Sequence, residues 1–301
     1  DGMVPADLTT LVNAAHQNGI KVIMSTCCSG GDWENSARQY QTTLINNILN
    51  TMATYNLDGW DLDWEPIQET HVNTYRTFVL ALRAAMDTRF GTNPRKLIVS
   101  YAGGQGAVNA LSPSNVYNAV DMILPQGYDL VSPSWSTCSG HGNDFYKSWH
   151  QGPLYSGTYT CPLGGHLPNL EDGSLDFVNA GVPRDKIAVS VRFQGSVWVD
   201  TVSGPYQGWT TAPIMWNDHG YSAWSYDVQW GGRNPGRNPF QSDAFQHESS
   251  TVASWLGYNP TGTTNDYFIS VDDSWAAYYK TKYVIDQGYG GVYVWTIQGE
   301  W

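Results

Sequence analysis

The spacing of apolar residues along this chain changes repeatedly between a helical period and short continuous runs. Apolar residues three and four apart predict helices, while short apolar runs bounded by glycine, proline or polar residues predict buried strands. The predicted helices cover residues 5–18, 36–55, 71–89, 116–120, 175–180 and 275–286. The predicted strands cover residues 21–26, 57–66, 96–102, 122–129, 186–193 and 290–296. Strands that alternate with helices in this way indicate a parallel α/β barrel.

Four segments fall outside this alternation. Residues 29–33 and 103–104 are predicted as loops that follow strands. Residues 130–168 are predicted as a long loop, and loops of that length usually carry function. Residues 196–268 are rich in Trp, Gly, Asn and Pro and fit no barrel helix.

The strand at residues 57–66 has an unusual pattern of acidic and apolar residues, reading Leu-Asp-Gly-Trp-Asp-Leu-Asp-Trp-Glu-Pro. Side chains of a strand alternate between its two faces. One face therefore carries Asp61, Asp63 and Glu65. The other face carries Trp60, Leu62 and Trp64. Asp58 falls off this alternation, and we interpret it as structural.

Three carboxylates on one strand face favour acid–base chemistry. Neighbouring carboxylates resist ionising together, so at least one of them should keep its proton to a higher pH. A carboxyl group that is still protonated near neutral pH can act as a general acid. Glu65 would lie at the carboxyl end of the strand, where barrel active sites are found. A calcium loop of the EF-hand type is excluded, because the glycine at its sixth position and its twelve-residue span are absent.

Composition narrows the class of substrate. The chain has 301 residues, enough for one large domain. Its net charge of −12 argues against nucleic acid as a partner. The 14 Trp and 19 Tyr suit neutral sugars, whose rings pack on flat aromatic faces. We expect no cofactor and a monomer.

The chain also carries signs of its location. It contains no apolar run of about 18 residues, so we expect no transmembrane helix and no membrane partner. Only 14% of residues are charged, and polarity comes from Gly, Ser, Thr, Asn and Gln, which we associate with secreted proteins. Asp1 and Gly2 open the chain without a signal peptide, as in a mature form. We therefore expect a secreted, extracellular protein.

Four cysteines permit three complete pairings. Cys138 and Cys161 lie in the same loop and are the preferred disulfide. The adjacent Cys27 and Cys28 could form a bridge with each other, pair elsewhere or remain thiols, and we favour thiols.

The pattern Asp-x-x-Asp-x-Asp-x-Glu at residues 58–65 resembles the signature of glycoside hydrolase family 18, the chitinases and their relatives. Residues 29–33, 126–129, 271–274 and 290–296 resemble further motifs of that family in the same order. The second of these reads Gln-Gly-Tyr-Asp where the family has Met-x-Tyr-Asp, so Gln126 replaces the methionine.

The resemblance implies a (β/α)8 TIM barrel formed by residues 1–195 and 269–301. Residues 196–268 would form a small α+β insertion between the last two strands, which makes one wall of the substrate cleft. The first two strands of the family's barrel have no counterpart before residue 5. An open barrel would leave strand edges unpaired, so we expect that an N-terminal segment is missing from the given chain.

The resemblance also implies roles for individual residues. Glu65 would protonate the leaving oxygen of a β-1,4 link next to N-acetylglucosamine. The acetamide of the substrate would be the nucleophile, an exception to the two-carboxylate scheme of most glycosidases. Asp63 would orient that acetamide, and Asp61 would share a proton with Asp63. Tyr128 would donate a hydrogen bond to the acetamide oxygen, and Trp295 would form the floor under the sugar.

Other residues complete the predicted substrate-binding set: Asp129, Gln126, Trp33, Tyr101 and Arg192. Further candidates for sugar stacking are Trp135, Trp198, Trp209 and Trp224. Each assignment competes with a structural one, since Tyr128 and the tryptophans could be core residues and Asp129 could cap a turn. The family often has a cis peptide after the acid, and we predict that Glu65–Pro66 is cis because proline lowers the cis penalty.

The leading hypothesis is a chitinase that binds chitin or N-acetylglucosamine oligosaccharides. An endo-β-N-acetylglucosaminidase acting on glycoprotein glycans is the second, and a sugar-binding lectin on an inactive barrel is the third. A metal hydrolase that uses the carboxylates with His141, His150 or His166 is the fourth. No close-spaced pair of histidines supports it.

Overall fold

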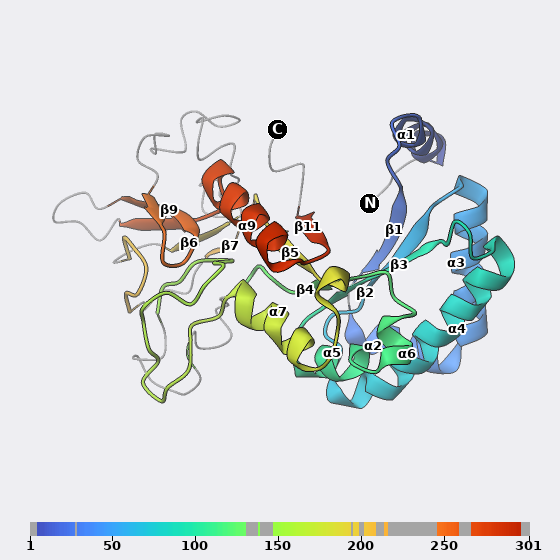
Figure 1. Ribbon diagram of the computed structural model, residues 1–301, viewed down its shortest axis with the longest axis horizontal. Helices are drawn as coiled ribbons and strands as arrows, with labels where there is room; N and C mark the ends of the chain where they lie inside the picture. Colours follow the sequence, from blue (N-terminus) through green and yellow to red (C-terminus); the bar gives the residue numbers. More distant parts are fainter. Residues whose placement is uncertain are drawn as a thin grey trace. The chain divides into compact units, whose positions relative to one another are not determined.

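A computed structural model describes residues 5–27, 29–130, 138, 147–193, 195–198, 202–208, 214–215, 246–258 and 266–295. The chain divides into two compact units, each shown as a ribbon in Figure 1. The first unit contains residues 1–126 and 176–187, and the second contains residues 127–175 and 188–301. The predicted boundaries at residues 195 and 268 stay a prediction.

A parallel four-stranded sheet organises the first unit, with the strands in sequence order. These strands are β1 (Ile23–Cys27), β2 (Gly59–Asp63), β3 (Leu97–Ala102) and β4 (Met122–Pro125). Helix α1 (Pro5–Gln17) precedes β1. The strands are connected by helices α2 (Gly30–Gln39), α3 (Gln41–Tyr55), α4 (Val72–Phe90), α5 (Gly104–Leu111) and α6 (Ser114–Tyr117). Short 3-10 helices span Glu69–His71 and Arg184–Lys186. The α7 helix (Leu170–Asn179) contributes residues to both units.

The register of this sheet aligns the carboxyl ends of its strands. Asp63 of β2 pairs with Cys27 of β1 on one side and with Tyr101 of β3 on the other. Parallel strands that leave the sheet at the same edge bring their following segments together. The end of the acidic strand therefore lies in the middle of one sheet edge, between the ends of two neighbours.

Two predicted loops of the first unit are helices. Residues 30–33 form the first turn of α2, because the Ser29 side chain accepts a hydrogen bond from the Asp32 backbone and acts as an N-cap. The segment 36–55 is not one helix, since α2 ends and α3 begins around Tyr40, whose φ of −127° is not helical. Residue 104, expected in a loop, begins α5.

The second unit contains a parallel pair and an antiparallel sheet. Strands β5 (Ala188–Val191) and β11 (Gly291–Val294) form the parallel pair, and α9 (Ser274–Gln287) precedes β11. The antiparallel sheet has the order β7-β6-β10-β9-β8. Its strands are β6 (Ser196–Trp198), β7 (Ile214–Met215), β8 (Gln246–Glu248), β9 (Ala253–Tyr258) and β10 (Tyr267–Ser270). This sheet falls within the region where the helix–strand alternation stops, apart from the last two residues of β10.

A hydrophobic cluster next to this sheet contains the predicted disulfide between Cys138 and Cys161, which is confirmed. Trp149, Trp198 and Phe268 pack in the same cluster with their side chains fully buried. Trp198 is therefore a core residue and cannot stack on a sugar. The candidates Trp135, Trp209 and Trp224, like His141, lie outside the described residues. In the part of the chain that the structure describes, every helix is too short or too polar to cross a membrane.

Candidate active site

The predicted alternation of β2 is confirmed in the structure. Leu62 and Trp64 are fully buried, while Asp61, Asp63 and Glu65 are half-buried. Asp61 and Asp63 interact through their like charges, and the carboxyl groups of Asp63 and Glu65 share a hydrogen bond. Asp61 and Asp63 thus share one face of β2, and Glu65, two residues beyond the end of the strand, is hydrogen-bonded to Asp63.

Asp61 is the innermost of the three carboxyl groups. Its Oδ2 accepts a hydrogen bond of 2.7 Å from Ser25 Oγ on β1. Burial and the negative charge of Asp63 raise the pKa of Asp61 to about 6, against the opposing effect of the Ser25 hydroxyl. Sequence reasoning missed Ser25. Its register opposite Asp61 in β1 was the signal that could have found it.

Asp63 keeps its proton near neutral pH and is hydrogen-bonded to Glu65. Burial, together with the hydrogen bond and negative charge of Glu65, raises the pKa of Asp63 to about 8. Two carboxyl groups at hydrogen-bonding distance cannot both ionise without strong repulsion. Asp63 therefore retains its proton at pH 7, and general acid catalysis requires such a proton.

The backbone around Glu65 is fixed by the N-terminus of α2. The Gly30 N–H donates a hydrogen bond of 2.8 Å to the Glu65 carbonyl. A Cβ atom at Gly30 would lie 2.3 Å from the Pro66 carbonyl oxygen, so only glycine permits this approach. The peptide bond between Glu65 and Pro66 is cis, as predicted.

Trp33 supports the acidic strand from the same helix. Its Nε1 donates a hydrogen bond of 3.1 Å to the Asp63 carbonyl, and its ring stacks on Trp64 with centroids 5.3 Å apart. Only 4% of Trp33 is exposed. These contacts are those of a core residue, so we do not retain Trp33 among the candidates for sugar binding.

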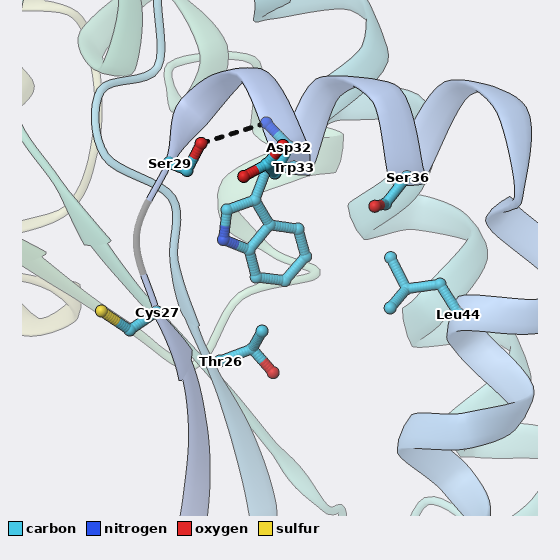
Figure 2. A pocket seen from close by; sticks show the side chains of 7 residues that line it. All are labelled: Thr26, Cys27, Ser29, Asp32, Trp33, Ser36 and Leu44. Atoms are coloured by element: carbon cyan, nitrogen blue, oxygen red, sulfur yellow. Dashed lines mark hydrogen bonds between the residues drawn. The ribbon is translucent and has the colours of Figure 1, made fainter. Parts of the chain in front are cut away.

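A small cavity of about 130 Å³ lies between the end of β1 and helices α2 and α3, beside Trp33. Figure 2 shows its lining, with the hydrogen bond from Asp32 to Ser29. This volume is below the roughly 300–1,000 Å³ of typical ligand pockets, and none of the three acids lines the cavity. It is therefore not a substrate site by itself.

Cys27, which also lines this cavity, corrects the expectation of free thiols. Cys27 is disulfide-bonded, and its partner lies outside the described residues. The adjacency of two cysteines does not set their oxidation state, because the backbone path after β1 decides whether a sulfur can be reached.

Two other predicted residues belong to the first unit. Tyr101 is buried at the end of β3, in register with Asp63. The Gln126 backbone N–H donates to the Ala102 carbonyl at 2.8 Å, and its side chain packs against the backbone at Gly103. Tyr101 therefore lies at the end of β3, beside β2, and Gln126 follows β4, the next strand of the sheet.

The second unit brings together four predicted residues. The Arg192 guanidinium forms an ion pair with Asp129 and lies 4.5 Å from the centre of the Tyr128 ring. The Tyr128 and Trp295 rings are stacked with centroids 6.5 Å apart. Trp295 is 49% exposed, whereas Arg192 is 1% exposed. A solvent-exposed aromatic ring such as that of Trp295, next to Tyr128, is suited to packing against a sugar ring.

Tyr293 is a member of this cluster that sequence reasoning did not single out. Its ring lies 6.2 Å from that of Tyr128. Burial raises the pKa of Tyr293 well above its ordinary value, and the neighbouring Tyr128 adds to the effect. Its hydroxyl therefore stays protonated. In the sequence, Tyr293 could have been recognised as a candidate from its position in β11, two residues before Trp295.

Histidines and acids form pairs but no metal site in the described ranges. His150 Nε2 lies 3.0 Å from Glu248, and His166 Nδ1 lies 3.2 Å from Asp172. Within the residues that the structure describes, no group of three potential ligands could hold a metal ion.

Known proteins resemble this chain over nearly its whole length. Chitinase A1 of Niallia circulans is 24% identical over 93% of this chain, which spans 41% of that relative. A glycoside hydrolase family 18 N-acetylglucosaminidase from Paenibacillus barengoltzii has a similar fold, with a TM-score of 0.76, 21% identity and coverage of 99% of this chain and 84% of the other. The chitinase-like agglutinin of Robinia pseudoacacia aligns with a TM-score of 0.71, 21% identity and coverage of 98% and 82%.

These structural neighbours indicate an α/β fold of the TIM-barrel type. The match to a family model is more specific than the fold, because it covers residues 6–300 and includes the acidic strand. This chain belongs to the glycosyl hydrolases family 18.

Proposed function

We propose that this protein is a chitinase that hydrolyses β-1,4-linked N-acetylglucosamine polymers with retention of configuration. The observation that carries the proposal is the half-buried, hydrogen-bonded pair of Asp63 and Glu65 at the carboxyl end of β2, in which the pKa of Asp63 is raised to about 8. A glycosidic oxygen is a poor leaving group until it is protonated, and a carboxyl pair of this kind supplies the proton at neutral pH.

In the proposed reaction Glu65 is the general acid. The raised pKa of Asp63 indicates that the proton lies on Asp63 in the free protein, hydrogen-bonded to Glu65. Transfer along that hydrogen bond prepares Glu65, which then protonates the leaving oxygen. The acetamide oxygen of the substrate attacks the anomeric carbon and forms a cyclic oxazolinium ion. Asp63, now ionised, accepts a hydrogen bond from the acetamide N–H and stabilises the positive charge.

Asp61 and the aromatic cluster have supporting roles in this proposal. Asp61 shares a proton with Asp63, whose negative charge contributes to the raised pKa of Asp61. Tyr128 donates a hydrogen bond to the acetamide oxygen, and the exposed Trp295 ring packs under the sugar. The other residues proposed to bind substrate are Asp129, Gln126, Tyr101 and Arg192. Water then opens the intermediate with Glu65 as the base.

The test replaces Glu65 by glutamine, which keeps the shape of the side chain and removes the acid. We expect kcat on chitin oligosaccharides to fall by about 10²–10⁴, while binding of the same oligosaccharides persists. Glu69→Gln is the matched control, because Glu69 is an exposed carboxylate that bonds only Asn109 in the described structure. Full activity of Glu65→Gln would contradict the proposal.

Two other functions are distinguished by related measurements. The similarity to an agglutinin favours a lectin as a second candidate, and a protein that binds chitin oligosaccharides without cleaving them would be that lectin. Release of glycans from a glycoprotein in preference to disaccharides from chitin would instead identify an endo-β-N-acetylglucosaminidase. We also propose that the protein is a monomer and is secreted from the cell. Gel filtration would test the oligomeric state, and fractionation of the source cells would test the location.

A further inference from the structure

Lys280 of α9 is completely buried, with an exposed fraction of 0%. Its ammonium group donates hydrogen bonds of 2.5 Å to Asp272 Oδ2 and 2.6 Å to the Gly152 carbonyl. A buried charge of this kind requires a partner of opposite charge and further hydrogen bonds. Lys280 has both, and its two acceptors lie in segments far apart along the chain.

Asp272, the first acceptor, also contacts the backbone of Arg192. Asp272 Oδ2 also accepts a hydrogen bond of 2.9 Å from the Arg192 backbone N–H, and the Asp272 N–H donates to the Arg192 carbonyl at 3.2 Å. The backbone of Arg192 is thus held on both sides by one residue. Its guanidinium group extends from that fixed point to Asp129 and across the Tyr128 ring.

Gly152, the second acceptor, contacts Gly127, the residue before Tyr128. A Cβ atom at Gly152 would lie 2.7 Å from the Gly127 carbonyl oxygen, so the two backbones are in direct contact. Ser190 Oγ donates a hydrogen bond of 2.7 Å to that same Gly127 carbonyl. The position of Gly152, which Lys280 holds, therefore limits where the chain can place Tyr128.

Tyr128 needs this support because of the residue that follows it. Asp129 has a φ of 53°, in the left-handed region that residues with a side chain rarely adopt. Such a conformation persists only where surrounding contacts hold it. Here the ion pair with Arg192 holds it on one side, and the Leu130 N–H bonds the Gln151 carbonyl at 3.2 Å on the other.

We propose that Lys280 is a positioning residue for Tyr128, acting through Asp272 and Arg192 on one side and through Gly152 and Gly127 on the other. This inference rests on the proposed function, in which Tyr128 contacts the acetamide of the substrate. Because that contact is made in the reacting complex, a displaced Tyr128 lowers kcat more than it raises KM.

The experiment is a double-mutant cycle on hydrolysis of the N-acetylglucosamine tetramer. Lys280→Met keeps the length of the side chain and removes both hydrogen bonds. We expect it to lower kcat at least tenfold while KM changes less than threefold. In the Tyr128→Phe background the same change should lower kcat less than threefold, because the hydroxyl it positions is already absent.

Lys282→Met is the matched control on the same helix, since the Lys282 ammonium is exposed and bonds Asp286. We expect the control to keep the kcat and KM of the parent protein. If Lys280→Met does not fold, Lys280→Met combined with Asp272→Asn removes both buried charges and takes its place in the cycle.

The inference would be overturned if the fold-reduction in kcat of the double mutant equalled the product of the reductions in Lys280→Met and Tyr128→Phe. Lys280 would then act independently of Tyr128. An unchanged kcat in Lys280→Met would overturn it as well. Both results leave the proposed function standing. A parent protein that hydrolyses no oligosaccharide, or a Tyr128→Phe variant with full kcat, would instead overturn the proposed role of Tyr128 and this inference with it.

Discussion

The acids of β2 and the acids of the second unit contrast in their partners. Asp61, Asp63 and Glu65 face one another, and no lysine or arginine of the described residues forms an ion pair with them. In the second unit, Asp272 pairs with Lys280 and Asp129 with Arg192.

The difference shows how one residue type serves two purposes. Without a cation, burial and like charge raise the pKa of Asp63 to about 8, so the group carries a proton at neutral pH. Burial also raises the pKa of Asp272, but the adjacent Lys280 ammonium opposes that rise and supplies a hydrogen bond. The first arrangement provides a proton donor, and the second provides a fixed anchor.

The strongest test of the contrast removes the cation from the anchor. Lys280→Met leaves Asp272 buried without its counter-charge, and breaking a buried pair typically costs about 3–5 kcal/mol. We expect the free energy of unfolding, measured by urea denaturation, to fall by that amount. Lys282→Met should not change it, because the exposed pair it breaks is surrounded by water. Equal effects of the two changes would show that burial of Lys280 contributes nothing.

A second test neutralises the proton donor. The pKa of Asp63 is raised from its ordinary 3.8 to about 8 on folding, so the stability it contributes is complete below pH 4 and is lost as the pH rises to 8. Asp63→Asn cannot ionise and escapes that loss. We expect the variant to be more stable than the parent at pH 8 by on the order of 1 kcal/mol, since water screens the half-exposed carboxyl, and to be inactive.

The measurement is thermal unfolding at pH 4 and pH 8, with Asp286→Asn as the control on an exposed acid. A stabilisation of Asp63→Asn that is the same at both pH values would contradict the assignment of the proton.

The smallest expected effect comes from Ser25. Its hydroxyl donates to Asp61 and lowers the pKa of that carboxyl. Ser25→Ala should therefore raise the Asp61 pKa from about 6. If activity requires Asp61 to be ionised, the acidic limb of the pH profile of kcat/KM should move to higher pH by less than about one unit. Movement to lower pH would show that Ser25 does not stabilise the ionised form.

Local sequence patterns predicted most strands of the sheet and the face that the acids occupy. The period-two alternation of β2 depends only on strand geometry, so Asp61, Asp63 and Glu65 could be placed without a structure. Local patterns were less informative at Ser29 and Gly104, where helices begin in segments that read as loops. Glycine is typical of loops and also occurs at helix starts. The N-cap hydrogen bond at Ser29 that distinguishes a helix start from a loop is visible only in the tertiary structure.

The sequence by itself determined the family, the order of the elements and the acidic face, because these depend on residues close together in the chain. Tertiary structure decided where the proton lies, which aromatic rings are open and what holds Tyr128. Ser25 is 36 residues from Asp61, and Lys280 is 128 residues from Gly152. Burial and charge act through space, so neither the buried Trp33 nor the exposed Trp295 could be distinguished until the chain had folded.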